Sequence, residues 1–352
     1  MINIDKSKPV MVTGATGYVA GWLVKKLLDE GITVHAPVRN PDNKDKIKHL
    51  LKLSEESGTE IKFFKADLLQ KGSYDKAVKD CQLVFHTASP FINSVKNPQK
   101  ELIEPALEGT RNVLESVNKT ESVKKVVLTS SVAAILGDTK DILDLPNKIA
   151  TEDNWNISSN EKHQPYSYSK TLAEKEAWKI NKKQNRWEMV VINPTLVLGP
   201  GINPEITSES FKLMKQLGDG SMKIGVPNFE IGIVDVRDLA EAHFNAAFFP
   251  DVSGRHIINA ESKSFFEIAD MIRDNYENKL NLPHRILPNW LVWIAAPAVG
   301  VKRKMVAKNM GYPWTVDNSK SIEKLKINYR PVKETVNDFF DQMYEFGAFN
   351  KS

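Results

Sequence analysis

The chain has 352 residues, of which 41% are hydrophobic and 26% are charged. These fractions are ordinary for a globular protein, and they exclude a collagen-like chain, a coiled coil and an intrinsically disordered chain. The formal net charge is only +4, so a nucleic-acid partner is not expected. The single cysteine, Cys81, excludes an internal disulfide and a zinc cluster built on thiolates.

The N-terminus passes directly from a polar segment into an apolar run, without the basic and hydrophobic regions of a secretory signal. The longest apolar stretch, residues 290–299, is about half the length of a membrane span. We therefore expect a cytoplasmic protein with no integral membrane association. Lys302, Arg303 and Lys304 follow that stretch. A membrane-surface anchor is thus an alternative to the favoured interpretation, a buried or lid helix.

Short β-branched runs alternate with longer amphipathic segments through the first two thirds of the chain. This alternation predicts βαβ units and an α/β fold, a Rossmann-type doubly wound parallel sheet with its ligand site at the carboxyl ends of the strands. The predicted strands are residues 10–13, 33–38, 61–65, 83–87, 126–130 and 189–193. The predicted helices are residues 22–29, 45–56, 74–79, 101–118 and 169–184.

After Pro194 the alternation gives way to prolines and glycines, which predicts a smaller C-terminal lobe that forms the far wall of the ligand crevice. We expect helices at 207–217 and 265–278, a strand at 232–235, and a helix at 237–249 that returns to the main sheet. The predicted Rossmann domain is residues 1–194 together with 231–260. The predicted substrate-binding lobe is residues 195–230 and 261–352.

A glycine-containing turn follows the first predicted strand and opens a helix, in the sequence Thr13-Gly14-Ala15-Thr16-Gly17-Tyr18-Val19-Ala20. Gly14 and Gly17 permit a tight turn and close approach of backbone N–H groups to a pyrophosphate, and Ala20 is small enough for close helix–strand packing. An ordinary βα turn is the alternative. The candidate cofactor-binding residues here are Gly14, Thr16, Gly17, Tyr18 and Val19.

The residues after the next three predicted strands are candidates for contacts with a dinucleotide, and the first of them indicates which dinucleotide is expected. Arg39 stands at the end of the second strand, where NAD-binding chains carry an acidic residue, and Lys46 follows it. A guanidinium suits a 2′-phosphate, so NADP is favoured over NAD. After the third strand, Asp67 and Leu68 are expected to contact adenine, although Asp67 could instead be a helix cap. After the fourth strand, the small residues Thr87, Ala88 and Ser89 allow the backbone to approach the cofactor.

Tyr166 and Lys170 are four residues apart and share one face of a predicted helix. An ammonium near a phenol favours the phenolate, and such a tyrosine can protonate a carbonyl oxygen as hydride arrives at carbon. The fifth strand ends in the hydroxyl residues Thr129, Ser130 and Ser131. We expect them to face the nicotinamide. Ser131 is the candidate that binds the substrate oxygen, with Ser130 as the alternative.

Together these motifs make the chain resemble the extended short-chain dehydrogenases/reductases, in the branch of dihydroflavonol reductases, cinnamoyl-CoA reductases and microbial aldehyde or ketone reductases. The motifs that carry the resemblance lie at 13–21, 38–41, 86–91, 128–131, 166–170, 193–195 and 234–238. The resemblance implies that Ser131, Tyr166 and Lys170 are the catalytic triad, and that Lys170 also holds the nicotinamide ribose. Further cofactor contacts are implied for Thr129, Pro194, Thr195, Val197 and Ser208.

The resemblance implies an NADPH-dependent carbonyl reductase acting on a small aldehyde or ketone. Residues 137–160 and 282–312 are expected to lack a counterpart in the plant reductases, which favours this general substrate class over flavonoids or CoA thioesters. The candidates for the pocket lining are Phe91, Leu136, Tyr168, Ile206 and Phe211.

Two other functions are alternatives to a carbonyl reductase. One alternative is an NAD-dependent nucleotide-sugar epimerase or dehydratase, and another is a non-catalytic dinucleotide sensor. The seven histidines are scattered without ligand spacing, so no metal site is expected. Whether the chain is a monomer or a homodimer is left open by the sequence.

Overall fold

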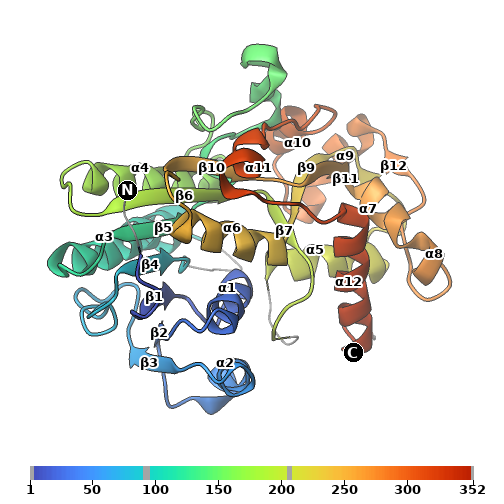
Figure 1. Ribbon diagram of the computed structural model, residues 1–352. Helices are drawn as coiled ribbons and strands as arrows, with labels where there is room; N and C mark the ends of the chain where they lie inside the picture. Colours follow the sequence, from blue (N-terminus) through green and yellow to red (C-terminus); the bar gives the residue numbers. More distant parts are fainter. Residues whose placement is uncertain (1–3, 90–95, 204–207, 350–352) are drawn as a thin grey trace.

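A seven-stranded parallel sheet forms the centre of the molecule (Figure 1). The structure is a computed structural model that describes residues 4–89, 96–203 and 208–349. The strand order is β10-β6-β5-β4-β1-β2-β3, and every adjacent pair runs parallel. The strands are β1 Val10–Thr13, β2 Val34–Val38, β3 Ile61–Lys65, β4 Leu83–His86, β5 Lys125–Thr129, β6 Glu188–Pro194 and β10 Gly254–Ile258. The predicted doubly wound Rossmann fold is confirmed.

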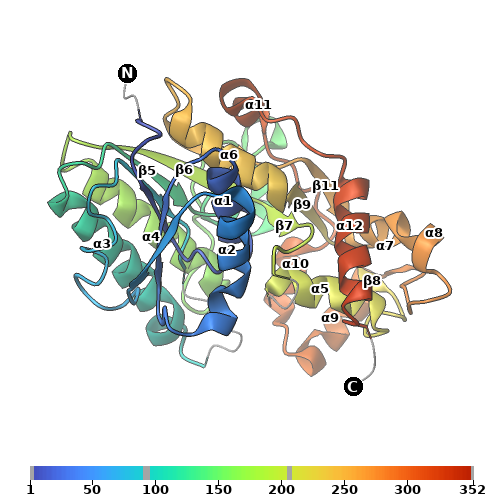
Figure 2. The same cartoon turned by 60° about the horizontal axis from the view of Figure 1, so that its bottom comes forward.

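Helices cover both faces of this sheet, as Figure 2 shows. One face carries α1 (Tyr18–Asp29), α2 (Lys44–Ser57) and α6 (Val236–Phe248), and the other carries α3 (Glu104–Lys119) and α4 (Pro165–Asn181). Because both faces are covered, the inner strands β1 and β4 are buried at every position. The strand order reverses between β1 and β4, and the carboxyl ends of the strands at such a reversal are where doubly wound sheets bind their ligands.

A second lobe adjoins the main sheet and has its own three-stranded sheet, in the order β11-β9-β7, and a β12-β8 pair. A cluster of buried residues forms its core, centred on Phe339, Phe340, Ile233 and Met214. The strands are β7 Leu196–Leu198, β8 Val226–Pro227, β9 Glu230–Asp235, β11 Glu261–Ser264 and β12 Ile286–Leu287. The helices are α5 Glu209–Gly218, α7 Phe265–Met271, α8 Arg273–Tyr276, α9 Asn289–Ala295, α10 Arg303–Asn309, α11 Ser319–Leu325 and α12 Val332–Glu345.

Residues 74–79 were predicted to form a helix, and this prediction is wrong. The segment is a series of turns in which Tyr74 and Val78 are buried as their spacing suggests. Gly72 has φ +74° and Asp80 has φ +66°, so the chain leaves the right-handed region on both sides of the segment. The Ser73 hydroxyl also donates to the Asp67 carbonyl at 2.7 Å, which supports a turn rather than a helix start.

Other elements also differ from the sequence-based expectation. The helix expected at 265–278 is broken at Ile272 (φ −103°, ψ −4°) into α7 and α8. The catalytic-candidate helix begins at Pro165 rather than at 169, since proline suits a first helical position. The strand expected at 232–235 forms, but as β9 it pairs with β7 and β11, while α6 and β10 join the main sheet. The proposed domain boundaries themselves stay a prediction.

The core of the second lobe depends on Phe339, whose side chain is fully buried and contacts Phe211 edge-on with ring centroids 4.5 Å apart. We expect Phe339→Ala to lower the free energy of unfolding by about 3–5 kcal/mol, because it leaves a cavity. The matched control is Phe346→Ala at the exposed end of α12, which should change that free energy by less than about 0.5 kcal/mol. Urea unfolding measures both. Similar losses in the two variants would contradict this account of the core.

Candidate active site

The turn between β1 and α1 is shaped to receive a diphosphate. Gly14 has φ +69°, and a Cβ there would lie 3.0 Å from the Ala88 Cα, so both conformation and space require glycine. The Gly17 N–H donates to the Gly14 carbonyl at 2.8 Å. No side chain caps the first turn of α1, which leaves its N–H groups for an anion. The residues in this turn therefore fit a dinucleotide.

Tyr18, a predicted cofactor contact, directs its side chain elsewhere. Its hydroxyl donates to the Gly199 carbonyl at 2.5 Å, and its ring contacts Phe211 and Phe339. Burial raises the pKa of Tyr18 well above its ordinary value. Only the Tyr18 backbone is thus available to a phosphate. Thr16 is half-buried in the turn, and Val19 packs against the main core.

Two exposed cations lie beyond the end of β2. Arg39 and Lys46 have no side-chain hydrogen bond or ion pair among the described residues. The nearby Asn43 caps α2 by accepting from the Lys46 N–H at 3.2 Å, so the Lys46 side chain has no structural task. Both cations are therefore available to bind an anionic group.

Asp67 and Leu68 follow β3. The Asp67 carboxylate accepts from the Leu69 N–H at 2.8 Å, which is a turn rather than a helix cap. The Leu68 side chain lies directly over Gly109 of α3, where a Cβ would come within 2.6 Å of the Leu68 Cγ. A surface made by Leu68 and a carboxylate beside it are consistent with the adenine contact that the sequence predicted.

The segment after β4 is fastened to the end of β1. The Thr87 hydroxyl donates to the Thr13 carbonyl, and the Ala88 N–H donates to the Thr13 hydroxyl at 3.1 Å. The Thr13 hydroxyl also lies 3.0 Å from Nδ1 of His86. Burial, together with the nearby positive charge of Lys170, lowers the pKa of His86 to about 3. His86 is thus a neutral, hydrogen-bonded core residue, and not an acid.

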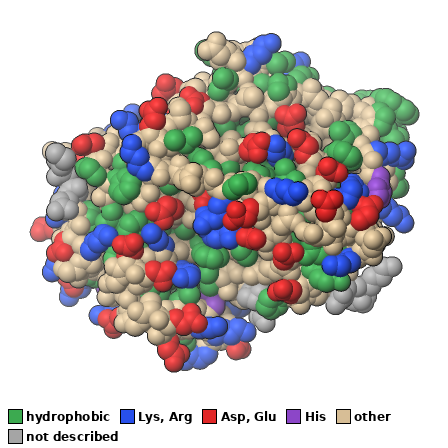
Figure 3. Space-filling model, turned by 45° about the vertical axis from the view of Figure 1, so that its right-hand side comes forward, with side chains coloured by type: hydrophobic (Ala, Val, Ile, Leu, Met, Phe, Trp, Pro, Cys, Tyr) green, Lys and Arg blue, Asp and Glu red, His purple; other side chains and the backbone are tan. Residues whose placement is uncertain are grey.

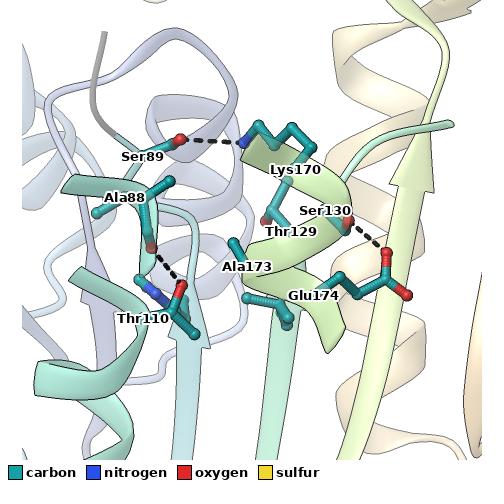
Figure 4. A pocket seen from close by; sticks show the side chains of 11 residues that line it. Ala88, Ser89, Thr110, Thr129, Ser130, Lys170, Ala173 and Glu174 are labelled. Carbon is teal, nitrogen blue, oxygen red and sulfur yellow. Dashed lines mark hydrogen bonds between the residues drawn. The ribbon is translucent and has the colours of Figure 1, made fainter. Parts of the chain in front are cut away.

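Lys170 projects from the second turn of α4 toward this segment, and Tyr166 lies one turn before it. The Lys170 Nζ lies 5.8 Å from the centre of the Tyr166 ring and donates to the Ser89 hydroxyl at 3.0 Å (Figure 4). The Tyr166 side chain is 51% exposed, so its hydroxyl is open to a ligand. A small pocket lies beneath Lys170, lined by His86, Ala88, Ser89, Ala106, Thr110, Leu128, Thr129, Ser130, Lys170, Ala173 and Glu174.

Buried polar contacts fix the start of α4. Gln164 has φ +53°, and its side-chain amide donates to the Asp138 carboxylate at 2.6 Å. His163 and Asn309 contact the same carboxylate at 2.8 and 2.9 Å. Asp138 thereby holds the residues just before Tyr166 in one conformation.

The hydroxyl residues at the end of β5 have different surroundings. The Ser130 hydroxyl is buried and donates to the Glu174 carboxylate at 2.5 Å. The Thr129 hydroxyl lies 2.7 Å from Nε2 of His243, whose pKa is lowered by burial to about 4. Ser131 is half-buried, and among the residues that the structure describes its side-chain oxygen accepts only from the Ala133 N–H, at 3.1 Å. Of the two serine candidates, Ser131 is the one with a hydroxyl proton still to donate.

Glu174 lines the pocket beneath Lys170 and was not predicted from the sequence. Its side chain is fully buried, and its carboxylate lies 2.6 Å from Nε of Arg255. It also accepts from the Asn193 amide at 2.8 Å and from the Trp178 indole at 3.3 Å. The Asn193 amide in turn donates to the Ser131 carbonyl at 3.1 Å. A charged residue one helical turn after Lys170, on the buried face of α4, was the available signal.

The remaining predicted residues lie farther along the chain. Pro194 ends β6, and Thr195 donates its hydroxyl to the Ile258 carbonyl at 3.2 Å. Val197 lies in β7, and the Ser208 side chain caps α5. Of the lining candidates, Leu136 packs with Ile142 and Trp314, Phe211 packs on the second core, and Tyr168 is half-buried. Phe91 and Ile206 lie outside the described residues.

The family model of the NAD dependent epimerase/dehydratase family matches residues 10–260. The chain belongs to this family. It is 38% identical to a cinnamoyl-CoA reductase of Medicago truncatula, over 93% of this chain and 98% of that relative. It is 35% identical to a bifunctional dihydroflavonol 4-reductase/flavanone 4-reductase of Malus domestica, over 79% of each chain. The resemblance to extended short-chain reductases is confirmed.

Solved structures of family members agree with this assignment. Gre2 of Candida albicans in complex with NADPH is 30% identical with a TM-score of 0.76, covering 97% of this chain and 99% of that chain. Yeast methylglyoxal/isovaleraldehyde reductase Gre2, also complexed with NADPH, is 27% identical with a TM-score of 0.77 and the same coverage. The predicted cofactor is therefore the one bound in these two neighbours.

One expectation about the plant reductases has to be corrected. Residues 137–160 and 282–312 were both expected to lack a plant counterpart. The alignment with the Medicago truncatula reductase covers 93% of this chain, which leaves too few unaligned residues to include both stretches.

Glu174 offers a test of how this family member holds its site together. We expect Glu174→Gln to lower the free energy of unfolding by about 3–5 kcal/mol, because it leaves the buried Arg255 cation without its partner. The control is Glu176→Gln on the same helix, which removes a half-exposed ion pair with Arg111 and should cost about 1 kcal/mol or less. Urea unfolding measures the free energy of unfolding of both variants. Equal decreases in the two variants would show that the Glu174–Arg255 pair stabilises the fold no more than the Glu176–Arg111 pair.

Proposed function

We propose that the chain is an NADPH-dependent carbonyl reductase that converts a small aldehyde or ketone to an alcohol. The observation that carries this proposal is the position of Lys170, which lies against the Tyr166 ring and bonds Ser89 at the carboxyl edge of the sheet. That edge, at the strand-order reversal, is where doubly wound sheets bind their ligands. The reductase names of the relatives support the same reaction class.

The residues that would hold NADP form two groups. The turn at Gly14 and Gly17, with the uncapped start of α1, would bind the diphosphate. Arg39 and Lys46, exposed and without partners among the described residues, would pair with a 2′-phosphate. When bound, NADPH supplies the hydride. At the other end of the site, Lys170 and Ser89 are the polar groups that would face the nicotinamide riboside. The Thr129 hydroxyl lines the same pocket but is paired with His243.

Tyr166 is the proposed proton donor, and its hydroxyl would protonate the substrate oxygen. The Lys170 cation lies close enough to the ring to stabilise the phenolate that proton transfer leaves. The Ser131 hydroxyl, which has a free proton, would donate to the same oxygen and orient the carbonyl. His86 and His243 are neutral because burial lowers their pKa values to about 3 and about 4. Neither imidazole can therefore supply the proton as a cation at neutral pH.

A nucleotide-sugar epimerase is the principal alternative, because it would use the same turn and the same Tyr/Lys pair. MoeE5 in complex with UDP-glucose and NAD is 18% identical with a TM-score of 0.71, a likeness that extends to the fold alone. An exposed arginine after β2, with no carboxylate in its place, favours NADP over NAD. A non-catalytic sensor is disfavoured because Ser131, Tyr166 and Lys170 are all present.

Replacing the proposed proton donor tests the reaction. NADPH oxidation by the wild-type chain is followed across a panel of aldehydes, ketones and diketones, and we expect Tyr166→Phe to lower kcat by roughly 10²–10⁴-fold. NADPH binding should be nearly unchanged, since the ring stays in place. Tyr344→Phe, an exposed phenol on α12, is the control and should keep full activity. Wild-type turnover by Tyr166→Phe would exclude it as the donor, and a wild-type chain inactive on every carbonyl would favour the nucleotide-sugar alternative.

Reversing the charge at Arg39 tests the cofactor assignment. Arg39→Asp should lower the preference for NADPH over NADH by on the order of ten- to a hundredfold, because hydrogen bonds to charged groups contribute about 1.5–3 kcal/mol. The change is measured as the ratio of kcat/KM for the two cofactors. Lys52→Asp, in an exposed pair farther along α2, is the control for added negative charge. An unchanged ratio in Arg39→Asp would remove Arg39 from the cofactor site.

A further inference from the structure

Residues 278–316 have an unusual charge pattern. The segment contains no Asp or Glu, although acidic residues are frequent in the rest of the chain. It carries six basic residues, Lys279, Arg285, Lys302, Arg303, Lys304 and Lys308. The small net charge of the whole chain, +4, does not reveal this cluster of basic residues. The segment itself therefore has a net positive charge. Lys279 lies apart from the other cations, over the Tyr276 and Tyr344 rings, and Glu277 from outside the segment lies 3.7 Å from His284.

The same segment exposes large apolar side chains. None of the residues of α9 is buried, and Trp290 and Val299 are 66% and 74% exposed. Figure 3 shows hydrophobic side chains gathered at the edge of the molecule that α9 and β12 form, with Lys and Arg side chains beside them. We call this surface the α9 face, and its exposed apolar residues are Ile286, Trp290, Leu291, Trp293, Ile294, Val299 and Val301.

The α9 face has a packed inner side. Ala296, Val306 and Met310 are buried together under α9 and α10. The Lys302 ammonium donates to the Lys162 carbonyl at 2.7 Å, and the guanidinium carbon of Arg303 lies 4.4 Å from the centre of the Trp293 ring. The outward position of the apolar side chains is thus a consequence of packing on the inner face, and not of a loose segment.

We infer that the α9 face binds the surface of a membrane that contains anionic phospholipid. Tryptophan rings are favoured at the boundary between headgroups and acyl chains, where an apolar body can be buried and the indole N–H can still bond. Lys302, Arg303, Lys304 and Lys308 lie in or just before α10, which packs against α9, and these cations complement a negative lipid surface. An apolar face bordered by Lys and Arg is the pattern of a helix that lies in the interface plane.

The chemistry of the face favours lipid over other occupants. In a symmetric dimer the same face of two copies would meet, which would place its cations against each other without a carboxylate to pair with. Among the described residues, no helix is long and apolar enough to cross a membrane. The association we propose is therefore peripheral, with the chain lying on the bilayer. It does not depend on the reductase activity proposed above.

Vesicle co-sedimentation of the full chain tests this inference. We expect binding to vesicles of phosphatidylcholine with phosphatidylserine, much weaker binding to phosphatidylcholine alone, and release at high salt. The variant Lys302→Gln/Arg303→Gln/Lys304→Gln should bind anionic vesicles on the order of a hundredfold more weakly, at about fivefold per cation. The double variant Trp290→Ser/Trp293→Ser should also bind vesicles more weakly. Its weaker binding should persist at low salt, because salt does not screen apolar contacts.

A matched variant distinguishes the effect of the α9 face from the effect of losing positive charge anywhere on the chain. Lys179→Gln/Lys182→Gln/Lys183→Gln removes three exposed cations at the far end of α4 and should leave vesicle binding unchanged. NADPH binding by each variant shows that it is folded. Equal loss in both triple variants, or equal wild-type binding to neutral and anionic vesicles, would overturn the inference. So would a concentration-dependent dimer that is lost in Trp290→Ser/Trp293→Ser without any vesicle binding, because the face would then be a contact between copies.

Discussion

The geometry of the site depends on the contacts of one buried carboxylate, that of Glu174. It meets Ser130 at the end of β5, Asn193 near the end of β6 and Arg255 in β10. Burial of a carboxylate and a guanidinium costs desolvation energy, which only close pairing and further hydrogen bonds offset. Each of the three strands supplies one such partner. The helix that carries Tyr166 and Lys170 is thereby fixed to the sheet at a single register, one turn beyond Lys170.

A second buried carboxylate, Asp138, fixes the other end of the same helix. It receives the Gln164 amide, which lies two residues before Tyr166, and the Asn309 amide at the end of α10. The start of α4 and α10, which packs behind the α9 face, therefore share one anchor. Because buried polar groups need all their partners, a displacement of α10 would disturb the residues that aim Tyr166. The candidate active site and the α9 face are thus connected through Asp138, although their side chains differ in chemistry.

The sequence predicted the parts of the fold that local patterns determine. Inner parallel strands are buried on both faces, so β1, β4 and β5 read as continuous apolar runs. The turn at Gly14 requires positive φ, and glycine marks it. The turns at 74–79 escaped prediction because their apolar spacing is helical while Ser73 satisfies the backbone of Asp67 instead. Glu174 escaped because its partners, Asn193 and Arg255, come from distant positions in the chain, and only the fold brings them together.

The turn at the start of α1 has a second structural task that a ligand-binding motif does not reveal. Tyr18 follows Gly17 directly, yet its ring lies between Phe211 and Phe339 of the second lobe and its hydroxyl bonds the Gly199 carbonyl. The same short segment thus offers its backbone to an anion and its side chain to the neighbouring core. Since α1 is a rigid element, a shift of its N-terminus would be transmitted to both. The turn at the start of α1 therefore joins the anion-binding backbone of the main sheet to the core of the second lobe.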